Sequence, residues 1–119
     1  AGAFHTHYME PAVDALRAAA TDHDVSDPGV TLISNRDGQV VTDGREVLDR
    51  LVAQVSNPVR WDLCMERFTT LGVTAVIELP PAGTLIGLAK RALKGVELLA
   101  VKTPDDLDAA RTLIKEHSA

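Results

Sequence analysis

The amino-acid sequence predicts an α/β fold with about three mainly parallel strands flanked by helices. Two features of the sequence lead to this prediction. Apolar residues recur at the spacing of a helix face in several segments, and between these segments lie three short runs of β-branched and aliphatic residues. Helical and extended segments alternate along the chain, which is typical of a parallel sheet whose strands are connected by helices.

The first half of the chain is predicted to contain two helices and one strand. A helix over 9–20, entered near Pro11, has its apolar residues on one face. Residues 30–35 (VTLISN) form a short β-branched run, and the turn-forming sequence RDG follows it. A helix over 43–55 opens with an aspartate and a glutamate at the spacing of a capping box. Pro58 ends this segment, because the residue before a proline is disfavoured in helical geometry.

The second half is predicted to contain three helices and two strands. A helix over 61–71 has its apolar residues on one side. The run 73–79 (VTAVIEL) barely alternates between apolar and polar residues, which is typical of a strand covered on both faces. A helix over 84–93 and a third strand over 96–102 follow. The last helix begins at Thr103, where a proline and two acidic residues complete a helix-start pattern.

Composition and charge narrow the classes of function. The 119 residues carry a net charge of −5, so a nucleic-acid partner is not expected. The single cysteine, Cys64, cannot form an internal disulfide and suits a reducing environment, so we expect a cytoplasmic location. No apolar stretch is long enough to cross a membrane. The chain does not begin with methionine, and three parallel strands leave two open edges, so we expect it to be part of a longer protein.

His5 is the residue best suited to catalysis. It follows an apolar stretch and precedes the first helix, a setting that suits a general base. A metal site with His7 is not expected, because zinc needs at least one further ligand and no HExxH or CxxC pattern supplies one. No serine is evident as a nucleophile, since Ser34 is followed by a turn and not by the helix of a nucleophile elbow. Cys64 lies on the apolar side of its helix, where packing is the simpler explanation.

Three motifs, GAFHTHYMEPA, NPVRW and LIGLAKR, stand in the same order and at similar separations as in malonyl-CoA:acyl carrier protein transacylases of bacterial type II fatty acid synthesis. The chain resembles the C-terminal portion of these proteins from residue 1 to about residue 115. The resemblance implies a three-layer, α/β-hydrolase-like acyltransferase fold, with 1–119 as the C-terminal part of the large catalytic subdomain. It also implies that the nucleophile-bearing part and a ferredoxin-like subdomain lie outside this sequence.

The resemblance implies transfer of a malonyl group from malonyl-CoA to the phosphopantetheine thiol of acyl carrier protein through a seryl ester. His5 falls on the family's catalytic histidine, which is the general base, and His7 falls on a position without a catalytic role. Gln54 matches the glutamine that accepts a hydrogen bond from that histidine, through its main-chain carbonyl. No cofactor is implied. The implied partners are malonyl-CoA, acyl carrier protein and the missing N-terminal portion of the same enzyme, without which we expect the chain to be inactive.

Two further positions relate to substrate and partner preference in the family. Phe4 belongs to an AFH sequence that accompanies malonyl selectivity in the related polyketide domains, since a phenyl ring leaves less room for the α-methyl group of methylmalonyl. One methyl group gives only ~1–3 kcal/mol of discrimination. Lys90 and Arg91 match basic positions that hold the acidic carrier protein, and with Lys94 they form the main basic cluster of this acidic chain.

One departure from the family and two alternatives stay open. The sequence ELPPAG (78–83) replaces the family's ExGPG, which leaves the conformation of this loop undecided. An acyltransferase domain of a polyketide synthase shares much of the same pattern. A non-enzymatic α/β binding module of the receiver or flavodoxin type is the alternative from a different class. However, the predicted strands end in Asn35, Leu79 and Lys102, and neither a terminal aspartate nor a glycine-rich phosphate loop follows them.

Overall fold

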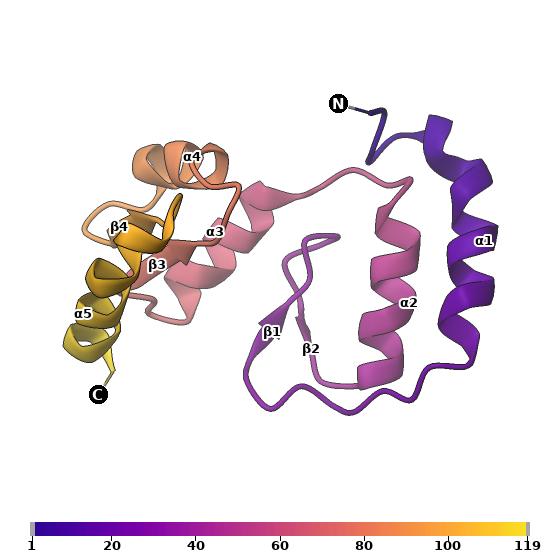
Figure 1. The fold of residues 1–119 in the computed structure, drawn as a ribbon, viewed down its shortest axis with the longest axis horizontal. Coiled ribbons are helices and arrows are strands. Elements are labelled where there is room, and N and C mark those ends of the chain that lie inside the picture. The colour runs from indigo at the N-terminus through magenta and orange to yellow at the C-terminus, as the bar shows by residue number, and fades with distance from the viewer. Residues whose placement is uncertain (1, 119) are drawn as a thin grey trace. The chain divides into compact units, whose positions relative to one another are not determined.

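The computed structural model describes residues 2–118 of the chain and divides them into two compact units. The boundary between the units lies between Arg67 and Phe68, within helix α3 (Trp61–Thr70). Both units combine helices with a small sheet, so the predicted α/β class is confirmed (Figure 1). No helix among the described residues is both long enough and apolar enough to span a membrane.

The first unit is built around helices α1 (Glu10–Thr21) and α2 (Gly44–Gln54). A short 3-10 helix, His7–Met9, leads into α1, and Pro11 occupies one of its first positions, where no intrahelical donor is needed. The two long helices pack side by side and run in opposite directions (Figure 1). Ala20 of α1 and Val52 of α2 are among the buried side chains of this unit. The predicted helices over 9–20 and 43–55 are therefore confirmed to within one or two residues at each end.

A two-stranded hairpin completes the first unit, and it differs from the predicted strand arrangement. Strand β1 (Leu32–Ile33) lies within the predicted run 30–35, but it pairs antiparallel with β2 (Val40–Val41) and not with the later strands. The RDG turn between them is present, with Gly38 at φ +68 donating its N–H to the Ser34 carbonyl at 2.8 Å. The sequence identified the turn but not the returning strand, because only two apolar residues precede the next helix start.

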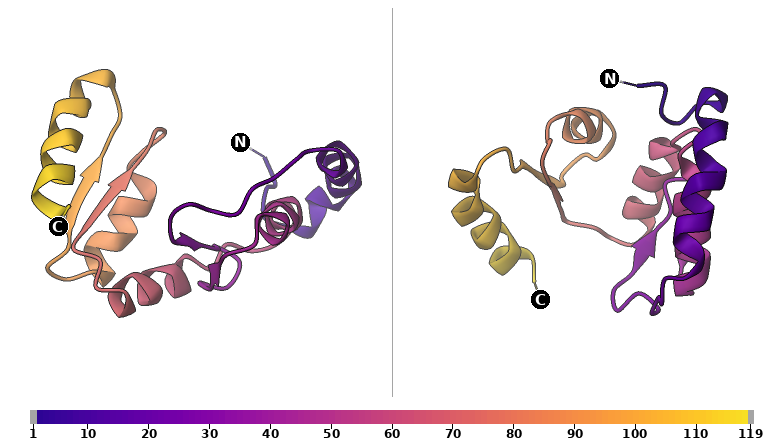
Figure 2. Two further views of the ribbon diagram at one scale, coloured as in Figure 1. Left: turned by 90° about the horizontal axis from the view of Figure 1, so that it is seen from below. Right: turned by 45° about the vertical axis from the view of Figure 1, so that its right-hand side comes forward.

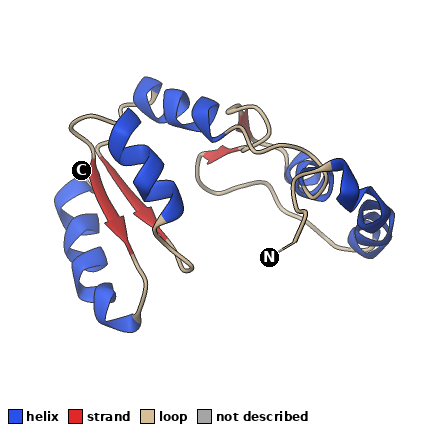
Figure 3. Cartoon of the chain, turned by 90° about the horizontal axis from the view of Figure 1, so that it is seen from above, coloured by secondary structure: helices blue, strands red, loops and turns tan. Residues whose placement is uncertain are grey.

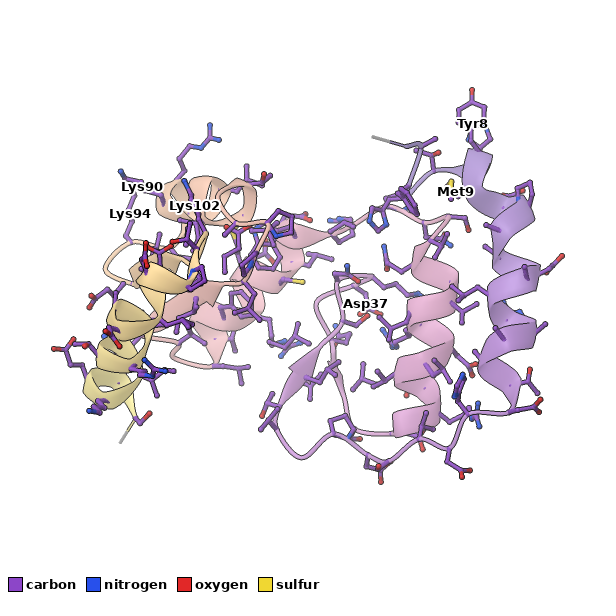
Figure 4. All side chains as sticks on the ribbon, in the orientation of Figure 1. Tyr8, Met9, Asp37, Lys90, Lys94 and Lys102 are labelled. Atoms are coloured by element: carbon purple, nitrogen blue, oxygen red, sulfur yellow. The ribbon has the colours of Figure 1, made fainter. Side chains whose placement is uncertain are left out.

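An ion pair ties the hairpin to α2. Both carboxylate oxygens of Asp37 accept hydrogen bonds from Arg50 Nη1, at 2.9 and 2.8 Å (Figure 4). Burial would raise the pKa of Asp37, but the hydrogen bonds from Arg50 and from the Gln39 N–H, with the nearby arginine charges, outweigh it. The pKa of Asp37 therefore lies below its usual range. The turn that the sequence predicts is thus fixed against the helix that follows it.

The start of α2 is capped as the sequence predicts. The Asp43 carboxylate accepts a hydrogen bond from the Glu46 N–H at 2.7 Å, which satisfies one of the unpaired donors of the first turn. Asp27 accepts from the Gly44 N–H at 2.9 Å. A Cβ atom at Gly44 would lie 2.3 Å from the Ser26 carbonyl oxygen, so only glycine allows the incoming loop to approach this closely.

The first turns of α3 pack against the hairpin. Cys64 is 2% exposed, and its thiol is 3.6 Å from the Ser34 carbonyl oxygen, which is within the range of a weak sulfur hydrogen bond. Burial raises the pKa of this thiol, and the negative charges of Asp62 and Asp37 act in the same direction. The prediction that Cys64 is a packed side chain is therefore confirmed, and its raised pKa disfavours the reactive thiolate.

The second unit contains a parallel strand pair between two helices. Strands β3 (Ala75–Glu78) and β4 (Glu97–Ala100) pair in parallel, as predicted, and α4 (Thr84–Ala92) connects them. Helix α5 (Leu107–His117) follows a 3-10 turn, Pro104–Asp106. Figures 2 and 3 show α4 and α5 on opposite sides of the strand pair. The buried apolar side chains described in this unit are small or aliphatic: Ala89, Leu93, Val101, Ala110 and Leu113.

The strand pair leaves apolar residues incompletely covered. Among residues 2–118 no third strand joins β3 and β4, so each has one unpaired edge. The central residues Val76, Ile77, Leu98 and Leu99 are only half-buried, although the sequence predicts strands covered on both faces. Leu79, at the end of β3, is 73% exposed. The predicted sheet of about three mainly parallel strands is thus a parallel pair, with the remaining run in the separate antiparallel hairpin.

A buried glutamate organises the loop whose conformation the sequence left undecided. The Glu78 carboxylate accepts hydrogen bonds from the N–H groups of Gly83, Leu85 and Ile86, at 2.8–3.0 Å. Gly83 is the N-cap of α4 and makes no side-chain cap, so Glu78 fulfils that role from the preceding strand. The Ile86 hydrogen bond contributes most to a lowered pKa of Glu78. The other two N–H groups and the Lys102 charge add to it, while burial opposes it.

This cap predicts an acid-sensitive helix start. Because the pKa of Glu78 is lower in the folded state, its stabilising contribution is complete above the ordinary titration range of glutamate and is lost as the pH falls through the lowered pKa. We expect Glu78→Gln to accelerate amide hydrogen exchange in α4 at neutral pH, and the difference from wild type to shrink in acid. Glu116→Gln, at an exposed position of α5, is the matched control. Equal exchange in both variants at neutral pH would contradict the assignment.

Candidate active site

His5 is held at two points against the end of α2. Its ring Nδ1 lies 2.8 Å from the main-chain carbonyl oxygen of Gln54, and its backbone N–H donates to the Val55 carbonyl at 2.8 Å. His5 has φ +65, a left-handed backbone that side-chain-bearing residues rarely adopt. The two contacts hold this otherwise unfavourable conformation in place. The contact with the Gln54 carbonyl is the one that the sequence resemblance implies.

The Gln54 contact determines which ring nitrogen of His5 can accept a proton. A carbonyl oxygen only accepts hydrogen bonds, so Nδ1 must carry the hydrogen in this contact. In the neutral ring, Nε2 is then left with its lone pair, which is the form that a general base requires. His5 is exposed in this chain, so Nε2 is open to a reacting group. A carbonyl here orients the imidazole as the aspartate does in a Ser-His-Asp triad.

The two contacts of His5 are made with the end of a helix. The last carbonyl groups of an α-helix lack intrahelical donors and carry partial negative charge, which stabilises a cation nearby. Helix α2 ends at Gln54, and the two carbonyls that contact His5 are those of its last residue and its C-cap. In the described structure, His5 is therefore held by main-chain carbonyls and not by a carboxylate.

The carbonyls that receive His5 belong to a closely hydrogen-bonded turn. Gln54 is 6% exposed, and its Nε2 donates to the carbonyls of Asn57 and Pro58, at 2.8 and 2.9 Å. Asn57 Nδ2 donates to the Ala53 carbonyl at 2.7 Å, and the Asn57 N–H donates to the Gln54 carbonyl at 3.3 Å. The NPVRW motif thus begins in the turn that supports the His5 acceptors.

The two side chains considered as nucleophiles are occupied within the first unit. Ser34 is 8% exposed, and its Oγ accepts a hydrogen bond from the Arg36 N–H at 3.3 Å. The Cys64 thiol is buried against the Ser34 carbonyl. Within residues 2–118, no three His, Cys, Asp or Glu side chains come close enough together to hold a metal ion. The described site therefore consists of His5 and the carbonyl that orients its ring.

The other predicted site residues lie at exposed positions. His7 stacks against Tyr8 with ring centroids 4.0 Å apart, and Figure 4 shows Tyr8 pointing away from the start of α1. Phe4, immediately before His5, is 59% exposed. Lys90 and Arg91 occupy the exposed last turn of α4 in the second unit. The structure thus brings His5 and Gln54 together within the first unit, and Phe4 lies next to His5 in the chain.

Two residues that were not among the predicted site residues contribute to this site. The Val55 carbonyl anchors the His5 backbone, and Asn57 supports the turn through its side chain. Every residue type has a main-chain carbonyl, so the identity of Val55 could not indicate that its carbonyl contacts His5. Asn57 could have been identified by its position before Pro58, where asparagine is typical of a turn that ends a helix.

No family model matches the chain. The malonyl CoA-acyl carrier protein transacylase of Mycobacterium tuberculosis strain H37Rv is 53% identical over 113 residues, which are 95% of this chain and 37% of the relative. The transacylase of the same name from Bacillus subtilis is 31% identical over 117 residues, or 98% of this chain and 37% of the relative.

Solved structures agree with these sequence matches. The crystal structure of MCAT from Mycobacterium tuberculosis matches with a TM-score of 0.83 at 54% identity, covering 91% of this chain and 36% of that one. A malonyl-transacylase in complex with its type II PKS acyl-carrier protein matches with a TM-score of 0.79 at 30% identity. The match covers 90% of this chain and 35% of that one. The resemblance to malonyl-CoA:acyl carrier protein transacylases is thus confirmed over nearly all of this chain, which spans 37% of the length of these relatives.

Proposed function

We propose that this chain supplies the general base of a malonyl-CoA:acyl carrier protein transacylase, and that the nucleophilic serine lies in the part of the enzyme that these residues do not match. In this proposal 1–119 form the C-terminal part of the large catalytic subdomain. The complete enzyme is this chain joined to that remaining part. The match to just over a third of each relative supports this division.

The reaction then proceeds in two transfers with His5 as the proton carrier. His5 Nε2 takes the proton from the serine hydroxyl while the serine oxygen attacks the malonyl thioester, and the proton passes to the departing coenzyme A thiolate. The carrier protein's phosphopantetheine thiol next gives its proton to Nε2 and attacks the seryl ester. The serine oxygen leaves and regains the proton, so the enzyme returns to its starting state.

One observation carries this proposal: the 2.8 Å contact between His5 Nδ1 and the Gln54 carbonyl, which leaves Nε2 as the proton acceptor. The test of the proposal compares the complete enzyme with its His5→Ala variant. The quantity measured is the single-turnover rate at which each forms the malonyl ester. A general base in this role predicts slower ester formation in the His5 variant at saturating malonyl-CoA. Unchanged acylation would contradict the assignment.

We propose that Phe4 limits the room for an α-branched substrate. Phe4→Ser in the complete enzyme should raise the ratio of kcat/KM for methylmalonyl-CoA to that for malonyl-CoA by at least roughly tenfold, since one methyl group is worth ~1–3 kcal/mol. Tyr8→Ser is the matched control, because Tyr8 is also exposed but its side chain points away from the start of α1 (Figure 4). A similar change of the ratio in both variants would argue against a specific role for Phe4.

We propose that Lys90 and Arg91 attract the acidic carrier protein. Both are exposed on α4, and Figure 4 labels Lys94 and Lys102 around the same helix. Reversing both charges to glutamate should raise the KM for carrier protein several-fold and weaken its dependence on salt, because exposed charges act mainly on association.

The matched control for this charge reversal is the pair Arg111→Glu and Lys115→Glu, two exposed basic residues of α5. Ester formation from malonyl-CoA should be unaffected by either pair of substitutions. An equal rise of KM for carrier protein in both double variants would show that only net charge matters.

A further inference from the structure

We infer that the side chain of Gln54, and not only its main-chain carbonyl, positions His5. This inference rests on the proposed function and assigns a second role within the same site. In it, the Gln54 carboxamide fixes the turn that carries both carbonyl acceptors, so that His5 keeps the Nδ1–H form. Gln54 is thus a positioning residue, because it acts on the reaction only through His5.

The side chain of Gln54 donates hydrogen bonds to main-chain carbonyls only three and four residues later in the chain. A carboxamide has two N–H donors, and both Nε2 contacts of Gln54 go to consecutive carbonyls, those of Asn57 and Pro58. The carbonyl of the same residue accepts from His5 Nδ1 at 2.8 Å. Gln54 therefore contacts both ends of the turn, and rotation of its peptide would break its side-chain bonds.

The turn needs this support because helical hydrogen bonding has ended. Pro58 has no N–H and disfavours helical geometry at Asn57, so the chain cannot continue α2 beyond this point. The carbonyls of Asn57 and Pro58 receive their donors from the Gln54 side chain. Without them, we expect the peptides that present the Gln54 and Val55 carbonyls to sample other orientations.

His5 is sensitive to any such movement. Its φ of +65 is held by contacts with these two carbonyls rather than by an intrinsic preference of the residue. If the Gln54 carbonyl turned away, the ring would lose the acceptor that keeps the hydrogen on Nδ1. The tautomer with the hydrogen on Nε2 cannot accept a nucleophile's proton at Nε2, the nitrogen that faces away from the Gln54 carbonyl.

The Gln54 amide oxygen points to a suitable substitution. Oε1 is buried and has no hydrogen-bond partner in the described part of the chain, so the side chain is retained there through its N–H donors. Gln54→Glu keeps the size but places a carboxylate oxygen against two carbonyl oxygens. Gln54→Met keeps the length and removes the donors without adding charge.

The test uses the complete enzyme and two readouts. We expect both Gln54 variants to lower kcat for malonyl transfer by roughly ten- to a hundredfold, with less effect on the KM for malonyl-CoA, as for a misplaced catalytic group. The second readout is the ¹⁵N chemical shifts of the His5 ring, assigned by their loss in His5→Ala. In the Gln54 variants they should move from the Nδ1–H form toward the Nε2–H form. Gln39→Glu, at an exposed glutamine of the hairpin, should change neither readout.

The outcomes separate this inference from the proposed function. Wild-type kcat and unchanged ring shifts in Gln54→Met would overturn the side-chain role, while a large His5→Ala effect would leave the proposed function intact. A lower kcat with the Nδ1–H shifts retained would also overturn it, because the loss would not act through His5. Circular dichroism shows whether Gln54→Glu folds. If it does not, kcat and the ring shifts of Gln54→Met alone test the side-chain role of Gln54. If His5→Ala is itself without effect, the proposed function fails.

Discussion

Replacing His5 with alanine in the complete enzyme should lower the rate of malonyl transfer by about 10²–10⁴-fold, the usual loss when a general base is removed. The structure gives the physical reason. The carbonyl contact at Nδ1 of His5 leaves the lone pair of Nε2 available for proton transfer. Both transfers need the same proton carrier, so acylation and deacylation should slow together.

His7→Ala is the internal control for this experiment. His7 lies two residues from His5 in the same HTH sequence, but its ring stacks on Tyr8. We therefore expect its removal to leave the transfer rate within a few-fold of wild type. Steady-state transfer of labelled malonyl groups to carrier protein measures both variants. A His5→Ala enzyme as active as His7→Ala would remove His5 from the mechanism.

The sequence predicted the helices and the parallel strands well because their causes are local. Asp43 at the start of α2 and Gly72 after α3 mark helix ends through the chemistry of their own side chains and backbone. The apolar run around Val76 forms a strand and pairs with the next such run, as expected. The partner of β1 was not predicted, because two valines between a turn and a helix cap give too short a pattern.

The pairing of His5 with Gln54 was predicted only from the resemblance to the family. Periodicity and composition made His5 a candidate base, but its partner Gln54 is an ordinary polar residue near a helix end in the sequence. The decisive contacts join His5 to residues about fifty positions away through main-chain oxygens, which no side-chain pattern encodes. Glu78 was missed for a similar reason, since its carboxylate caps a helix that begins several residues later.

A second large effect is expected for these 119 residues studied without the rest of the enzyme. Seryl ester formation needs a nucleophile on a sharp turn beside the base. Ser34 and Cys64 are buried and hydrogen-bonded elsewhere, which leaves His5 without a partner among the side chains that the sequence suggested. We therefore expect no malonyl transfer to carrier protein by this chain alone, although the complete enzyme should transfer readily.

The most direct measurement incubates the purified chain with labelled malonyl-CoA, denatures it and determines the protein-bound label by intact mass. The complete enzyme is the positive control and should carry one malonyl ester. We expect no stable ester on the 119-residue chain, because in the proposed function it supplies only the base. A stable ester on the chain, lost when one of its own serines or its cysteine is replaced, would contradict that division of the active site.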